Sequence, residues 1–205
     1  MLQEVPMIRK FVLLLLVALT GSVFAQKATL NEAAPNFKLV DSNGNEHSLS
    51  DFAGKNVVLE WINYDCPFVK KHYDSNNMQN LQAKYTEKDV VWLAICSSNK
   101  GKQGNFSAEE INKRSKKHDA KFSAYLIDED GKVGKMYGAK TTPHMYIINA
   151  EGVLVYAGGI DDKATTDVKD VKGAKNYIAL ALDELLSGKG VSTQSSTPYG
   201  CSVKY

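Results

Sequence analysis

Three cysteines, Cys66, Cys96 and Cys201, carry most of the chemical information in this chain. Cys66 is followed by Pro67, and proline at the first position of a helix loses no needed hydrogen bond, so this pair predicts a helix that begins just after the cysteine. A thiol at a helix N-terminus is stabilised as a thiolate by unpaired backbone N–H groups and by the helix dipole. Because the thiolate is the nucleophilic form, Cys66 is the candidate catalytic residue.

Two further stretches bear on the same chemistry. Lys70, Lys71 and His72 follow Cys66 along the expected helix and could add positive potential, although we interpret them as a solvated helix face. Pro143 directly precedes an expected strand over residues 145–148. Proline cannot donate to a sheet, so this position is typical of the start of a strand.

The elements that must position these residues alternate between strand and helix. The Asn43-Gly44 pair predicts a hairpin turn, and Ser107 with Glu110 predicts a capped helix start. A final helix is indicated by apolar residues at three- and four-residue spacing. We expect strands over 37–40, 46–49, 56–62, 90–95, 125–127, 145–148 and 153–156, and helices over 67–85 (with a break at 75–77), 107–118 and 174–185. This order predicts an α/β layered domain with a mixed sheet.

Composition excludes several classes of protein. The 205 residues are 43% hydrophobic and 23% charged, which is ordinary for a globular protein and unlike collagen, disordered or repeat sequences. A formal charge of +2 gives no general attraction to nucleic acid or anionic lipid. The basic cluster at 113–118 has no interleaved aromatic residues, so we interpret it as a solvated face and expect no nucleic-acid partner.

The two ends of the chain differ from the middle. Arg9 and Lys10 precede an apolar run over 11–19, followed by small residues up to Ala25, which predicts a secretory signal peptide over 1–25. The run is much shorter than the roughly 20 residues of a membrane-spanning helix, although an uncleaved anchor is the alternative. We therefore expect an exported, periplasmic or secreted protein without stable membrane insertion, a domain over 26–189 and a flexible tail over 190–205.

The order of these motifs resembles that of a known fold. The run 57–61 leading to Cys66-Pro67, then Thr142-Pro143, then the hairpin and last helix, is similar to thioredoxin-fold proteins. The nearest branch is the peroxiredoxin-like one, the alkyl hydroperoxide reductase and thiol-specific antioxidant superfamily, together with exported thiol:disulfide oxidoreductases. The resemblance covers about residues 30–188. It implies that Cys66 is the nucleophile, that Pro143 is a cis-proline facing it, and that the Thr142 backbone holds an extended substrate.

Two positions depart from the patterns of these families. Val69 stands where a Cys-x-x-Cys motif has its second cysteine, so a resolving thiol must come from elsewhere. We favour Cys201 in the tail over Cys96, which we interpret as a small buried apolar residue. Asn63 stands where a peroxiredoxin usually has the Thr or Ser that orients peroxide. We place Asn63 and Pro67 with Thr142 and Pro143 among the substrate-binding residues.

The function expected from the sequence is that of an exported thiol-based oxidoreductase with antioxidant or disulfide-exchange activity. The Cys66 thiolate attacks a disulfide or a peroxide, giving a mixed disulfide or a sulfenic acid, which Cys201 or an external thiol reductant resolves. No flavin, haem, nucleotide or metal cofactor is expected. The alternatives are a copper-handling protein, for which Cys66, His72, His144 and Met145 supply soft ligands without a recognisable spacing, and a catalytically silent binding protein.

Overall fold

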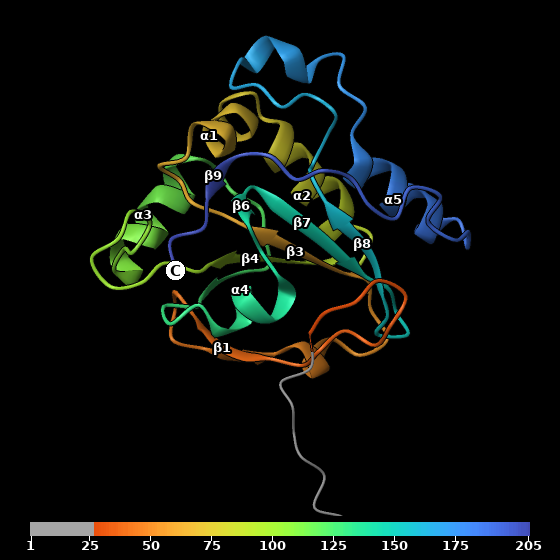
Figure 1. Ribbon diagram of the computed structural model, residues 1–205, viewed down its shortest axis with the longest axis horizontal. Helices are drawn as coiled ribbons and strands as arrows, with labels where there is room; N and C mark the ends of the chain where they lie inside the picture. The colour runs from red at the N-terminus through yellow and green to blue at the C-terminus, as the bar shows by residue number, and fades with distance from the viewer. Residues whose placement is uncertain (1–26) are drawn as a thin grey trace, which may run out of the picture.

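The computed structural model describes residues 27–205, so the expected signal peptide lies outside the described residues. A seven-stranded sheet in the order β2-β1-β5-β4-β3-β7-β8 forms the centre of the molecule (Figure 1). β3, β4 and β5 run parallel, whereas the other neighbours are antiparallel. The mixed sheet predicted from the sequence is therefore confirmed. The strands are β1 (Lys38–Asp41), β2 (Glu46–Ser48), β3 (Val57–Trp61), β4 (Val91–Cys96), β5 (Ala124–Ile127), β7 (His144–Ile148) and β8 (Leu154–Gly158).

Helices cover both faces of the sheet, and each face has its own apolar core. In Figure 1, α1, α2 and α5 lie above β3 and β4, and α4 lies below these two strands. The all-buried strand β3 serves both cores, because Val58 packs on one side while Val57, Leu59 and Trp61 pack on the other. The helices are α1 (Pro67–Asp74), α2 (Asn77–Thr86), α3 (Ala108–Lys117), α4 (Lys132–Tyr137) and α5 (Tyr177–Leu186), with short 3-10 helices η1 (Leu49–Phe52) and η2 (Val168–Val171).

Local sequence explains most of these boundaries. The expected break after the first helix is confirmed: Asn76 has a left-handed backbone (φ 58°) and separates α1 from α2. Ser107 accepts a hydrogen bond from Glu110 N at 3.3 Å and starts α3. The sequence does not predict α4, since a six-residue helix between Gly131 and Gly138 is too short to show a periodic pattern.

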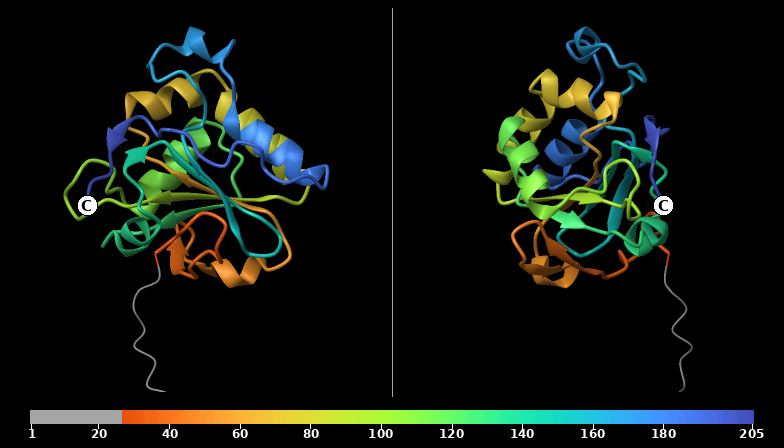
Figure 2. Two further views of the ribbon diagram at one scale, coloured as in Figure 1. Left: turned by 45° about the vertical axis from the view of Figure 1, so that its right-hand side comes forward. Right: turned by 90° about the vertical axis from the view of Figure 1, so that its left-hand side faces the viewer.

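The C-terminal segment differs most from expectation. Residues 190–205 were expected to be a mobile extension, yet they follow a defined path along the domain (Figures 1 and 2). Ser195 bridges to Ala157, β9 (Cys201–Ser202) pairs antiparallel with β6 (Thr141–Thr142), and Lys204 bridges to Ser98. The Ser/Thr-rich composition predicts a mobile tail because it offers few apolar side chains to bury. The tail is instead attached through backbone hydrogen bonds, which amino-acid composition does not reveal.

Within residues 27–205, no helix combines the length and apolar character needed to cross a bilayer.

Candidate active site

Cys66 lies in the loop that connects the end of β3 to the start of α1. It is the N-cap residue of that helix, with an extended backbone (φ −74°, ψ 125°), and Pro67 follows at the first helical position. Cys66 N donates to Asn63 O at 2.9 Å, and Cys66 O accepts from Lys70 N at 2.9 Å, so both backbone groups are fixed. The helix that the Cys66-Pro67 pair predicts is therefore present. The side chain itself is fully buried, with 0% exposure.

The loop before β7 covers the thiol. The Thr142-Pro143 peptide bond is cis, and Thr142 belongs to β6. In its thiol form, Cys66 Sγ donates to Thr142 O at 3.0 Å. The structure thus brings together three residues from distant parts of the sequence, Cys66, Thr142 and Pro143, as the resemblance implies.

Cys201 is the fourth residue of this candidate site. In the β6–β9 pairing it is opposite Thr142, whose carbonyl oxygen accepts from the Cys66 thiol, and the two cysteines are close enough to shift each other's pKa. Gly200 allows this close approach, because a Cβ atom there would lie 2.1 Å from Thr142 O. Cys96 is placed differently: it is buried, and its Sγ donates to Gly104 O at 3.4 Å. Of the two possible partners for Cys66, the structure places Cys201 beside it.

The pKa values of the two neighbouring thiols are shifted in opposite directions. Burial acts to raise the pKa of Cys66, but the neighbouring polar groups of Cys201, Thr142 and Val69 favour the thiolate and outweigh it, so the pKa is lowered. Burial raises the pKa of Cys201 to about 11, and the neighbouring Cys66 adds to the shift. These shifts favour Cys66 as the thiol that ionises first.

Asn63 and Pro67 lie at the edge of this site. The Asn63 side chain accepts from Asp65 N at 3.0 Å and donates to Gln103 O at 3.3 Å, so it supports the loop that precedes Cys66. Pro67 is exposed at the start of α1. Lys70 is exposed as well, which agrees with its interpretation as part of a solvated face.

The interpretation of Lys71 and His72 as solvated is wrong. Their exposures are 1% and 0%, and both lie beside Asp161 and the tail residue Tyr199. A signal for His72 was available in the sequence: Val69, His72 and Tyr73 recur at three- and four-residue spacing and form one buried helix face. Asp161 and Tyr199 had no such signal, because they lie in irregular segments.

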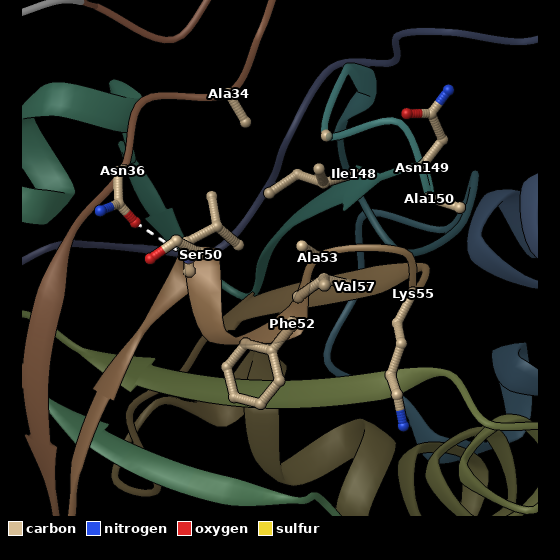
Figure 3. Close-up of a pocket in the computed structure, with 12 residues that line it drawn as sticks. Ala34, Asn36, Ser50, Phe52, Ala53, Lys55, Val57, Ile148, Asn149 and Ala150 are labelled. Carbon is tan, nitrogen blue, oxygen red and sulfur yellow. Dashed lines mark hydrogen bonds between the residues drawn. The ribbon is translucent and has the colours of Figure 1, made fainter.

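Two further findings concern ligand sites. Among residues 27–205, no group of three or more His, Cys, Asp and Glu side chains is arranged to hold a metal ion. A pocket of about 170 Å³ lies at the opposite end of β3 from Cys66 (Figure 3). It is lined by Phe52, Val57 and Ile148 among others, and Ser50 N donates to Asn36 at its rim (3.0 Å). None of the candidate site residues contributes to it.

Comparisons with known proteins agree with this geometry. The family model described as Redoxin matches residues 29–178. The thiol-disulfide oxidoreductase ResA of Bacillus subtilis (strain 168) is 31% identical over 155 residues, which cover 72% of this chain and 81% of ResA. The crystal structure of an uncharacterized conserved protein from Geobacillus kaustophilus is 30% identical, with a TM-score of 0.72 over 86% of this chain and 92% of that protein. A putative thiol:disulfide interchange protein DsbE from Chlorobium tepidum, 24% identical over 64% of this chain and 85% of that protein (TM-score 0.53), shares the fold.

A buried cysteine at a helix entry, facing a cis-proline loop on a thioredoxin fold, is typical of thiol-based oxidoreductases. The Redoxin match spans well over half of the sequence. The chain belongs to the Redoxin family, and it is a thiol-based oxidoreductase.

Proposed function

We propose that this protein is an exported thiol:disulfide oxidoreductase in which Cys66 is the nucleophile and Cys201 is the resolving thiol. The observation that carries the proposal is the position of Cys201, which is 135 residues from Cys66 in sequence. The β6–β9 pairing sets Cys201 opposite Thr142, and the Thr142 carbonyl oxygen is 3.0 Å from Cys66 Sγ. The names of the relatives support disulfide exchange as the reaction class.

The reaction takes place in two exchange steps. The Cys66 thiolate attacks one sulfur of a substrate disulfide, which forms a mixed disulfide and releases the other substrate sulfur as a thiolate. Cys201 then loses its proton and attacks Cys66 Sγ, which forms the Cys66–Cys201 disulfide and releases the second substrate thiolate. The substrate gains two electrons and the protein loses two. An external thiol reductant returns the protein to its dithiol form.

The acidities of the two thiols support this order of steps. While Cys66 is a thiolate, its negative charge contributes to the raised pKa of Cys201. Once Cys66 is part of a mixed disulfide, its negative charge is gone and that contribution disappears. Lys204, whose charge lowers the pKa of Cys201, remains nearby. Cys201 thus becomes more acidic at the step in which it must attack.

Access to Cys66 requires the tail to leave β6. Cys66 is fully buried while β9 is paired with Thr141 and Thr142. When β9 leaves, the backbone edge of β6 becomes free beside the thiol, and an extended polypeptide can pair with it in the same way. This geometry favours a disulfide in an extended protein segment as the substrate. For peroxide, the Asn63 side chain is already committed to Asp65 and Gln103.

Export is part of the proposal and is supported by the signal-like sequence over residues 1–25. A periplasmic or extracellular location exposes the protein to disulfide substrates. Fractionation of cells, with N-terminal sequencing of the mature protein, tests this part. A mature chain beginning near Gln26 outside the cytoplasm is expected, and an intact N-terminus in the cytoplasm would contradict it.

The chemistry is tested by single-turnover oxidation of the reduced protein with a model disulfide and, separately, with hydrogen peroxide. With the disulfide, we expect the wild type to form the Cys66–Cys201 bond, Cys201→Ser to stop at the mixed disulfide, and Cys66→Ser to react at the rate of an ordinary thiol. Equal reactivity of Cys66→Ser and the wild type would refute the proposal. Much faster oxidation by peroxide would instead assign the protein to peroxidase chemistry.

A further inference from the structure

Tyr199 lies two residues before Cys201 and joins the tail to a buried polar cluster behind the thiols. Its hydroxyl donates a hydrogen bond to Asp161 Oδ1 and lies 3.1 Å from His72 Nε2. Its ring packs against Phe68, with ring centroids 5.9 Å apart. Phe68 is two residues after Cys66, so α1 contacts Tyr199 close to both cysteines.

The hydrogen bonds of this cluster run in one direction. The Asn77 amide lies 2.9 Å from His72 Nδ1 and donates to it. Burial, with the nearby Lys71 charge, lowers the pKa of His72 to about 3, so the ring is neutral and its proton is on Nε2. His72 Nε2 therefore donates to the Tyr199 hydroxyl, which in turn donates to Asp161. Each donor in this series of hydrogen bonds therefore has a single acceptor.

The Asp161 carboxylate, which accepts the last of these hydrogen bonds, depends on the tail for one of its donors. Asp161 is 2% exposed, and its Oδ2 has no hydrogen-bond partner within the described residues. Lys71 Nζ is 3.8 Å from Asp161 Oδ2 and donates to Lys163 O at 2.6 Å. Oδ1 accepts from Lys163 N (2.9 Å) and from Tyr199. Because a buried carboxylate is costly without donors, removal of Tyr199 leaves Asp161 under-satisfied.

We infer that Tyr199 is a positioning residue for thiol exchange: its hydroxyl, held between Asp161 and His72, keeps Cys201 against Cys66. The inference rests on the proposed function and adds a residue to it. The Tyr199 hydroxyl bonds to Asp161 and His72, not to the sulfur atoms, and it acts by raising the effective concentration of the Cys201 thiol at Cys66. When the tail leaves β6, this same contact must open.

The test is the rate at which Cys201 resolves a mixed disulfide between Cys66 and glutathione, because the tail leaves β6 before this mixed disulfide forms and must dock again to resolve it. Tyr199→Phe keeps the ring and removes the hydroxyl, and Asp161→Asn weakens the acceptor. Tyr85→Phe is the matched control, because the Tyr85 hydroxyl also bonds to a carboxylate (Asp183 Oδ1, 3.0 Å), but on α2 and away from the tail. The reduced protein is oxidised with oxidised glutathione, samples are quenched with acid at successive times, and mass spectrometry follows the loss of the mixed disulfide.

We expect the rate constant of this resolving step to fall about tenfold or more in Tyr199→Phe and Asp161→Asn, the size expected for loss of a hydrogen bond to a charged group. Tyr85→Phe is expected to match the wild type even if its melting temperature falls. Equal constants for Tyr199→Phe and the wild type would overturn the inference alone. A wild type that forms no Cys66–Cys201 disulfide would refute the proposed function, and the inference with it.

Discussion

The substitution Gly200→Ala tests most directly whether the docked tail controls access to Cys66. Gly200 has a left-handed backbone (φ 138°), and an added Cβ would lie 2.1 Å from the Thr142 carbonyl oxygen. Ordinary van der Waals contact begins near 3.4 Å, and the obstructing atom belongs to the backbone of β6. The tail cannot accommodate the methyl group without moving away from the strand to which it is paired.

The size of the effect follows from the strain that the methyl group adds to the docked tail. The β6–β9 pairing is broken on undocking in the wild type as well, so its hydrogen bonds do not change the ratio between the two proteins. A non-glycine residue in this backbone region costs about 1–3 kcal/mol. The upper end of this range corresponds to roughly a 100-fold increase in the ratio of undocked to docked tail.

The assay is alkylation of the reduced, native protein by iodoacetamide, with mass spectrometry to follow each cysteine separately. When opening and closing are fast, the rate at Cys66 follows the open population, so we expect it to rise by up to about 100-fold in Gly200→Ala. Gly190→Ala is the matched control, since Gly190 is also in the tail and a Cβ there would meet no atom within 4 Å. Unchanged alkylation of Cys66 in Gly200→Ala would refute the reasoning that β9 closes the site.

Two further predictions concern other buried groups. Burial raises the pKa of Cys96 to about 11, so we expect this thiol to resist alkylation in the same native assay. We also expect Cys96→Ala to form the proposed Cys66–Cys201 disulfide as the wild type does. Rapid labelling of Cys96 in the native protein would contradict its buried position. Burial also raises the pKa of Glu60 to about 7, despite hydrogen bonds from Trp92, Gln82 and Tyr73. Between pH 4.5 and 7 the folded protein therefore keeps a proton that the unfolded chain has lost, and the free energy of unfolding should fall by up to about 3 kcal/mol as pH rises through this window. Urea unfolding at pH 5 and pH 7.5 measures the fall, which should be smaller in Glu60→Gln; equal falls in both proteins would show that Glu60 does not titrate in this range.

Local sequence determined much of the scaffold. The Asn43-Gly44 turn, the capped start of α3, the break at Asn76 and the Cys66-Pro67 helix entry each depend on a few neighbouring residues, so they were readable without the tertiary structure. The alternation of strands and helices was sufficient to predict a mixed sheet. Short α4 was missed because six residues are too few to establish a periodicity.

Resemblance to a family added what the residues alone could not. It placed Thr142 and Pro143 opposite Cys66, a juxtaposition that depends on how β3 and β7 pair in the sheet. The error at Lys71 and His72 had another source, since it came from the general expectation that a run of charged residues is solvated on a helix surface. The helical spacing of Val69, His72 and Tyr73 was the local sign that His72 faces inward.

By itself, the sequence determined that Cys66 begins a helix and that Val69 leaves it without a neighbouring second thiol. Only the tertiary structure decided that Cys201, rather than Cys96, lies against Cys66 and that the tail is docked. The physical reason is that the tail is held by backbone pairing to β6 and by the Tyr199 hydroxyl on Asp161. Backbone pairing has no side-chain signature, and the Tyr199–Asp161 contact joins residues 38 positions apart, so neither leaves a local pattern in the sequence.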